Sequence, residues 1–224
     1  MQPATIDLKS STEPDDLNQM NAAFGDLTPG QTLIVQTAGN PRGLISRFME
    51  VHWGEFDWAL LREESGNCAA SLTRRTSPGP SGLLEMMEAD HRRCDELFSQ
   101  AEDAAQQGDL PQAQTLYQQF ALGMTRHFSM EEDGFFSSFD ERMGSTGGGP
   151  VMVMREEHQQ ILGLMSRMGN ALDNGDLEDY LGAADTLLYL MEQHNMKEEQ
   201  MLYPMADDVF GEDREAIIKK MFLL

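Results

Sequence analysis

The sequence has few cysteines, few basic residues and no long apolar run. Cys68 and Cys94 are the only cysteines in 224 residues. Two isolated cysteines are too few for a disulfide framework, so a reducing compartment is expected. Lysine and arginine number 16 against 38 aspartates and glutamates, which gives a formal net charge of −22. This acidic excess argues against nucleic-acid partners and anionic membrane surfaces, because both are bound through basic side chains.

The chain also lacks the features of an exported or membrane protein. No stretch approaches the roughly 18 apolar residues that a spanning helix needs. Residues 1–7 have neither the basic segment nor the apolar segment of a signal peptide. We therefore predict a cytoplasmic protein with no nucleic-acid partner and no membrane partner.

What the chain does contain is an internal repeat. His127 and Glu131 recur as His194 and Glu198, an offset of 67 residues. The same offset relates His91 to His158, Met87 to Met154, and the Gly-Asp-Leu sequence at 108–110 to that at 175–177. A repeat of this length indicates two copies of one supersecondary unit. It includes four of the five histidines.

Each half of the repeat predicts a helix hairpin folded at its Gly-Asp turn. His91 and His127 are 36 residues apart with Asp109 midway, so at about 1.5 Å rise per residue they lie at the same height. Four residues turn a helix through about 400°, so Glu131 shares the face of His127. Two such hairpins predict four imidazoles and two carboxylates in one layer. These residues are His91, His127, Glu131, His158, His194 and Glu198.

A single His-x-x-x-Glu is usually an ordinary helix pair, and its repetition is what indicates a metal site. Six such residues exceed the four or so ligands of a structural zinc. They suit two octahedral ions bridged by the carboxylates, and imidazole with carboxylate suits iron, manganese or zinc. Ferritin-like sites use Glu-x-x-His, which occurs only at Glu88 to His91, so a ferritin-like site is rejected.

The remaining pattern predicts two domains and a linker. Residues 1–75 predict a small α+β two-layer sandwich of order βαβαββ, with strands at 5–8, 32–37, 56–61 and 68–73, a helix at 14–27 and another from Pro41. Residues 76–82 form the linker. Residues 83–224 predict an all-α up-down four-helix bundle with helices at 83–107, 111–139, 150–174 and 177–205, a Gly-rich loop at 144–150, and a short C-terminal helix.

The first domain resembles the small TusA/SirA-like sulfur carriers. The resemblance rests on the βαβαββ order, on Pro14 near the first helix and on the Thr-Pro-Gly-Gln turn at 28–31. Those carriers place a cysteine just before that proline, whereas this chain has Ser-Thr-Glu. No persulfide relay is therefore expected. Cys68 is expected to be a small buried residue, and His52 a surface or packing residue.

The ordered histidine motifs over residues 83–206 resemble the hemerythrin-like HHE cation-binding domain. The resemblance implies a non-haem di-iron centre, two iron ions with an oxo or hydroxo bridge, and assigns metal ligation to the six residues of the predicted layer. The oxygen-carrying members have a fifth histidine where this chain has Leu162. They also end in His-x-x-x-x-Asp. Glu199 stands at that place, but it is expected to point about 100° away from Glu198, as Glu132 does from Glu131.

Four histidines and two glutamates instead resemble the relatives tied to nitric oxide stress and iron–sulfur cluster repair. We predict a di-iron protein that binds a small diatomic gas, nitric oxide or oxygen, in nitrosative or oxidative stress. One alternative is an enzyme that reduces nitric oxide or peroxide, or supports cluster repair. Another is an oxygen or redox sensor that signals through the N-terminal domain. The sequence has no flavin or iron–sulfur motif, so turnover requires a redox protein partner, and sensing a signalling partner.

Overall fold

The computed structural model describes residues 3–9, 13–77, 79–144 and 149–224. Two compact units divide the chain, Met1–Pro80 and Ser81–Phe222. Three predicted features fall partly outside the described residues: the tripeptide before Pro14, the linker and the Gly-rich loop. Across the described ranges, no helix has both the length and the apolar character needed to cross a membrane.

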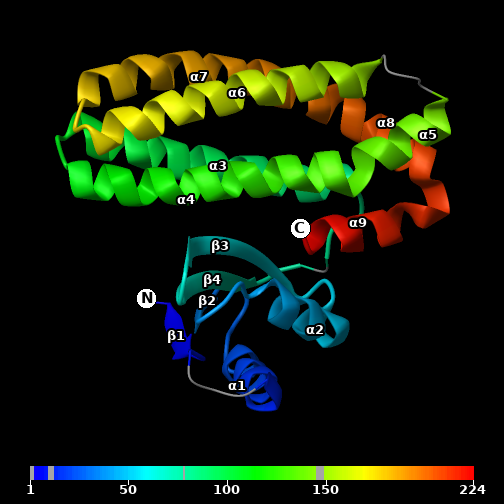
Figure 1. The fold of residues 1–224 in the computed structure, drawn as a ribbon. Coiled ribbons are helices and arrows are strands. Elements are labelled where there is room, and N and C mark those ends of the chain that lie inside the picture. The colour runs from blue at the N-terminus through cyan, green and yellow to red at the C-terminus, as the bar shows by residue number, and fades with distance from the viewer. Residues whose placement is uncertain (1–2, 10–12, 78, 145–148) are drawn as a thin grey trace. The chain divides into compact units, whose positions relative to one another are not determined.

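The first unit has the predicted βαβαββ order. Its elements are β1 (Ala4–Asp7), α1 (Glu13–Gly25), β2 (Thr32–Thr37), α2 (Arg42–His52), β3 (Phe56–Glu64) and β4 (Asn67–Arg74). The strands form one sheet in the order β1-β2-β4-β3, in which β1 is parallel to β2 and the other pairs are antiparallel (Figure 1). A parallel pair needs a crossover, which α1 supplies, whereas a short turn joins β3 to β4. The predicted fold class of this unit is confirmed.

An aromatic cluster forms the centre of this unit. Phe24, Phe48 and Phe56 are at most 1% exposed. Phe48 packs edge to face on the other two rings, with centroids 5.1 Å from Phe24 and 5.0 Å from Phe56. His52 stacks on Phe48, and Cys68 is a buried free thiol. The packing roles expected of these two residues are therefore the ones observed.

The second unit is an up-down bundle of long helices. They are α3 (Leu83–Gln106), α4 (Leu110–Ser129), α6 (Pro150–Asp173) and α7 (Leu177–Lys197). α3 pairs with α4 and α6 with α7, and the two hairpins pack through α4 on α6 and α3 on α7 (Figure 1). The shorter elements are η1 (Met130–Phe136), α5 (Ser137–Met143), η2 (Glu198–Leu202), α8 (Tyr203–Phe210), η3 (Gly211–Asp213) and α9 (Arg214–Phe222). The helices predicted to be continuous over 111–139 and 177–205 are thus interrupted by the π-helical turns η1 and η2.

The two hairpin turns are built alike. Gly108 and Gly175 adopt positive φ angles of 75° and 71°, which favour glycine. The side chains of Asp109 and Asp176 then cap the following helices by accepting from the backbone N–H three residues on, at 3.2 Å and 3.0 Å. Each long helix of the second hairpin begins 67 residues after its counterpart. The sequence repeat is therefore a structural repeat.

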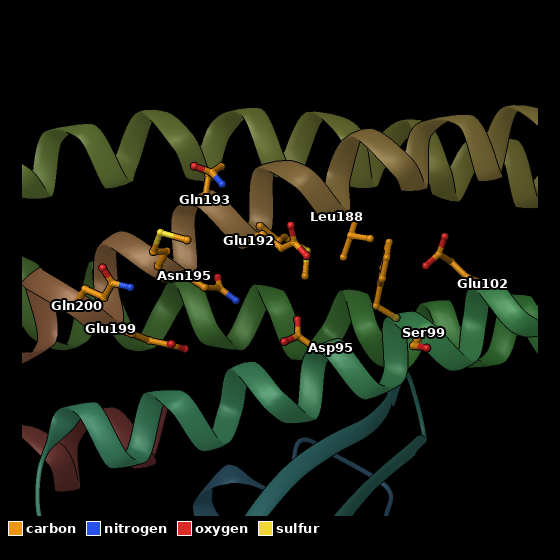
Figure 2. Close-up of a pocket in the computed structure, with 12 residues that line it drawn as sticks. Asp95, Ser99, Glu102, Leu188, Glu192, Gln193, Asn195, Glu199 and Gln200 are labelled. Atoms are coloured by element: carbon orange, nitrogen blue, oxygen red, sulfur yellow. The ribbon is translucent and has the colours of Figure 1, made fainter.

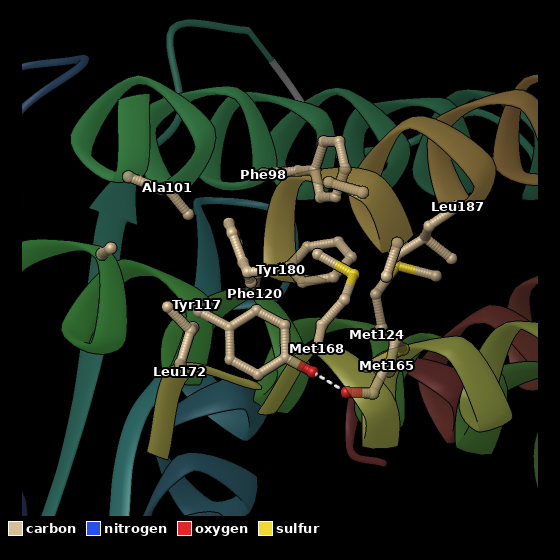
Figure 3. Close-up of a cluster of buried hydrophobic side chains, with 14 of the residues drawn as sticks. Phe98, Ala101, Tyr117, Phe120, Met124, Met165, Met168, Leu172, Tyr180 and Leu187 are labelled. Atoms are coloured by element: carbon tan, nitrogen blue, oxygen red, sulfur yellow. Dashed lines mark hydrogen bonds between the residues drawn. The ribbon is translucent and has the colours of Figure 1, made fainter. Parts of the chain in front are cut away.

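An apolar core fills the bundle between these turns and the histidine layer. Its buried side chains come from all four long helices (Figure 3). Among its polar groups is the hydroxyl of Tyr117, which donates to the carbonyl of Met165. Leu162 packs against the same core. This core fixes the positions of the four helices and therefore of the side chains that they carry into the layer.

Candidate metal centre

The six predicted residues meet in one buried layer of the bundle. The four histidines come one from each long helix and are at most 3% exposed, while the two glutamates come from the π-helical turns and are 0% exposed. Their nitrogen and oxygen atoms form two groups in which all ligand-type atoms lie within 4.8 Å of one another. The first, here the tetrad, is Glu131, His158, His194 and Glu198. The second, here the triad, is His91, His127 and Glu198.

Glu198 belongs to both groups and lies between them. Its Oε1 is 3.1 Å from His194 Nε2, and its Oε2 is 3.4 Å from His91 Nε2. The Nε2 atoms of His91 and His127 are 3.1 Å apart. Adjacent nitrogen ligands of one ion, with bonds of roughly 2.1 Å, stand at about this separation. The arrangement is that of two neighbouring cation sites with one carboxylate between them.

The lack of hydrogen-bond partners in the tetrad also favours a bound cation. Four buried atoms have no hydrogen-bond partner among the described residues: Glu131 Oε2, His158 Nε2, His194 Nε2 and Glu198 Oε1. Glu131 Oε2 is 3.1 Å from His158 Nε2, but without the geometry of a hydrogen bond. A buried polar atom left unpaired costs about 1–3 kcal/mol. Four such atoms together cost several kcal/mol, which a bound metal cation would offset.

Each histidine is oriented by a carboxylate outside the layer. The Nδ1 contacts are His91 to Glu199 at 2.7 Å, His127 to Asp90 at 3.1 Å, His158 to Glu132 at 2.7 Å and His194 to Glu157 at 3.0 Å. An ionised carboxylate only accepts, so Nδ1 carries the proton. In the neutral imidazole Nε2 then presents its lone pair to the layer, which is the tautomer that metal ligation requires. These outer carboxylates were missed as functional residues in the sequence.

Glu132 and Glu199, expected to point away from Glu131 and Glu198, belong to neither group of the layer, but both contact it from outside. Each lies off the face of its own helix's histidine but contacts a histidine of the other hairpin. Glu132 reaches His158, and Glu199 reaches His91. The projection of a single helix omits the neighbouring helices, and the π-helical turns change the angular spacing. A signal was available in the sequence, because Glu132 and Glu199 recur at the same 67-residue offset as the layer residues.

The C-terminal helix α9 supports the first π-helical turn. Lys220 Nζ donates to the carbonyls of Asp133 and Gly134 at 2.6 Å and 3.2 Å. A Cβ atom on Gly134 would lie 2.6 Å from Met221 Cγ, so only glycine allows α9 to pack this closely. These contacts hold the backbone segment that presents Glu131 to the layer.

The pKa values of the layer residues indicate that protons and a metal cation would compete for the same atoms. Burial alone would lower the pKa of His91 and of His194, but their contacts with Glu198 more than offset it and raise both to about 9. Burial lowers the pKa of His127 to about 4. Burial and the Glu198 carboxylate raise the pKa of Glu131 well above its usual range. A cation that binds here has to displace protons, because metal ligands are deprotonated.

A pocket of about 610 Å³ lies between α3 and α7 beside the layer (Figure 2). Its lining includes the carboxylates of Asp95, Glu102, Glu192 and Glu199. Burial raises the pKa of Asp95. Glu199 both lines this pocket and accepts the Nδ1 hydrogen bond of His91. The acidic pocket therefore reaches the outer side of the triad.

Comparison with known proteins identifies the bundle. The model of the hemerythrin HHE cation binding domain matches residues 82–206, a span that includes all six residues of the layer. Comparisons with curated proteins and with solved structures returned no match. The matched span covers more than half of the 224 residues. It includes the four long helices and the buried histidines and glutamates that could bind a cation. The chain therefore belongs to the hemerythrin HHE cation-binding family.

Proposed function

We propose that this is a di-iron protein whose reduced centre binds nitric oxide in nitrosative or oxidative stress. The observation that supports the proposal is the buried layer of four imidazoles and two carboxylates, divided into two groups that share Glu198. Imidazole with carboxylate suits iron. A bound ferrous ion with an open position supplies a place for a diatomic ligand.

The number of protein ligands favours a centre that accepts an outside molecule. Two six-coordinate ions have more positions than four imidazoles and two bridging carboxylates fill. The oxygen-carrying pattern would add a fifth histidine at position 162. Here Leu162 packs against the apolar core instead and offers no ligand atom. We therefore expect one iron to be more open, so that oxygen oxidises the pair while nitric oxide forms an adduct.

The test begins with elemental analysis and anaerobic gas addition to the full chain. Two iron ions per chain are expected, with a nitrosyl signal on adding nitric oxide and irreversible conversion to the diferric state on adding oxygen. One zinc per chain would refute the di-iron proposal. An oxy spectrum that disappears on deoxygenation over repeated cycles would make the protein an oxygen carrier or sensor instead.

A substitution at Leu162 tests the cause of this gas preference. Leu162→His supplies the additional imidazole and is expected to move the protein towards reversible oxygen binding. Leu164→His is the matched control, because Leu164 lies on the same helix and also packs against the apolar core. It should leave the response to both gases unchanged. If the two variants responded alike to both gases, position 162 would not be the cause of the gas preference.

A further inference from the structure

The repeat breaks at one residue beside the two glutamates. Tyr203 stands 67 residues after Phe136. Its side chain is 0% exposed, and its hydroxyl lies 2.9 Å from Glu131 Oε1 and 2.9 Å from Glu198 Oε2. One hairpin therefore places a hydroxyl against both carboxylates, and the other places a plain phenyl ring at the corresponding position.

The two aromatic rings occupy equivalent places. The ring of Phe136 lies 5.8 Å from that of His158, and the ring of Tyr203 lies 6.0 Å from that of His91, both measured between centroids. The packing of the two halves is thus similar at this point. The difference between them is the phenolic oxygen, and Phe136 shows that the fold accepts phenylalanine in such a place.

Tyr203 contacts the carboxylate oxygens that face away from the tetrad. Glu198 turns Oε1 to the tetrad, while its Oε2, which is 3.4 Å from His91 Nε2, accepts from Tyr203. Glu131 turns Oε2 to the tetrad, 3.1 Å from His158 Nε2, and its Oε1 is the second atom that Tyr203 contacts. On Glu198 the hydroxyl therefore holds the oxygen that an ion in the triad would use.

The two groups differ in how far their atoms are already hydrogen-bonded. The four tetrad atoms have no hydrogen-bond partner among the described residues. In the triad, His91 Nε2 and His127 Nε2 lie within hydrogen-bond distance of each other at 3.1 Å, and Glu198 Oε2 accepts from Tyr203. A cation in the triad therefore has to replace the hydrogen bond from Tyr203 to Glu198, whereas the four tetrad atoms have no hydrogen bond to replace.

The carboxylates that orient the histidines from outside the layer also differ between the two halves. Glu132, which orients His158, forms an ion pair with Arg155 at 3.2 Å. For Glu199, which orients His91, no Lys or Arg lies within ion-pair distance in the part of the chain that the structure describes. The repeat counterpart of Arg155 is Glu88, an acid in place of a base. Glu199 instead lines the acidic pocket between α3 and α7.

We propose that Tyr203 makes the two metal positions unequal. The ion in the tetrad binds first and tightly, and the ion in the triad binds more weakly and exchanges through the pocket beside Glu199. Tyr203 is a positioning residue, because it acts through the carboxylates of Glu131 and Glu198. The inference deepens the proposed function and rests on the metal binding that it assumes.

The experiment is an anaerobic titration of the metal-free full chain with Mn²⁺. Calorimetry gives the two binding constants, and electron paramagnetic resonance distinguishes an isolated ion from a coupled pair. In the wild type the second constant should be at least about tenfold weaker, with isolated ions dominant at one equivalent. Tyr203→Phe releases both carboxylate oxygens, so it should strengthen the second step about tenfold, the effect of one buried hydrogen bond to a charged group. The first step should change less than about threefold.

Three further variants control and assign the steps. Tyr117→Phe removes another buried tyrosine hydroxyl, which donates to the Met165 carbonyl in the apolar core (Figure 3), and should leave both constants unchanged. His127→Ala should keep the tight step, because the tetrad is intact. His194→Ala should lose it and retain only weak binding. Circular dichroism of each metal-free variant checks that the bundle is folded.

A substitution outside the layer tests the exchange route. Glu88→Arg restores the basic residue of the other half and should pair with Glu199, slowing transfer of the weaker ion to a chelator several-fold. Glu88→Gln is its matched control, since it removes the acid without supplying a cation, and should have less effect. Unchanged release from Glu88→Arg would overturn the exchange through the pocket.

The remaining outcomes separate this inference from the proposed function. Equal constants for the two ions in the wild type would overturn the inequality while leaving metal binding intact. Equal weakening of both steps in Tyr203→Phe would show a purely structural tyrosine and overturn its assigned role. Binding of no ion by the wild type would overturn the proposed function itself.

Discussion

The buried side chains of the α/β unit and of the helical bundle differ in kind. Within the described residues of the α/β unit, the buried side chains are apolar and centre on three phenylalanines. In the described part of the bundle, eight buried side chains are polar or charged: Asp90, His91, Arg126, His127, Glu131, His158, His194 and Glu198. Burying polar and charged groups is costly unless they are paired or bound to a metal. Stability alone therefore accounts for the first core but not for the second.

This contrast indicates that metal binding belongs to the bundle. The unfolding of the two units can be followed by different signals. Both tryptophans, Trp53 and Trp58, lie in the α/β unit, so their fluorescence reports the unfolding of that unit. Far-ultraviolet circular dichroism is dominated by the long helices of the bundle. The two signals allow a change in one core to be measured without the other.

The largest expected effect is the loss of metal on removing a layer carboxylate. Glu131→Ala and Glu198→Ala should each lower the iron content from about two ions per chain, the number that two six-coordinate sites imply. Glu198→Ala should be the more severe, because Glu198 belongs to both groups. Glu96→Ala, an exposed acid on α3, is the control and should keep full iron. Elemental analysis of anaerobically purified protein decides between these outcomes.

A large change in stability without a change in metal is expected from the other core. Phe48→Ala removes a 0%-exposed ring from the aromatic cluster and should destabilise the α/β unit by about 3–5 kcal/mol. Denaturant unfolding followed by tryptophan fluorescence measures the loss. Iron content and the helical signal should remain those of the wild type. Loss of iron in this variant would break the proposed separation.

Metal removal should destabilise the helical bundle and leave the stability of the α/β unit unchanged. Binding to the native state alone adds about 2.7–4.1 kcal/mol when the free ion is at 100 to 1,000 times its dissociation constant. A chelator should therefore lower the thermal midpoint of the helical signal and leave that of tryptophan fluorescence in place. Equal shifts of both signals would mean that the two units do not unfold independently.

The smallest expected effect comes from the outer carboxylates. Glu132→Ala and Glu199→Ala each leave one histidine without its Nδ1 partner, which should weaken metal binding about 10–100-fold. Competition with a chelator of known affinity measures the change. Glu132→Gln and Glu199→Gln keep an accepting oxygen and should lose less. Wild-type affinity in both alanine variants would show that these carboxylates do not support the site.

Sequence periodicity was informative wherever a local pattern decides the structure. The predicted strand at 32–37 is the observed β2, and the Gly-Asp turns end α3 and α6 as expected. These elements follow from turn chemistry and from apolar spacing, which act over a few residues. The 67-residue offset then predicted six residues in one layer, because two hairpins of the same length place corresponding residues at the same height along the bundle.

The features that periodicity missed depend on the neighbouring helix. The predicted helix at 111–139 is interrupted by η1, whose backbone is held by Lys220 from α9, 86 residues beyond Gly134. Glu132 and Glu199 orient histidines of the opposite hairpin. Such contacts join residues far apart in the chain, and no pattern within one helix contains them.

The sequence by itself determined that this protein has two hairpins with a repeated His and Glu set, because 3.6-residue periodicity and turn residues act locally. Only the tertiary structure decided which oxygen of each glutamate faces which histidines. It also decided that the hydroxyl of Tyr203 lies against both layer glutamates, where the other half has the phenyl ring of Phe136. The physical reason is that a buried polar atom takes its role from the partners packed around it. Those partners come from four helices and two π-helical turns that are distant in sequence and adjacent in space.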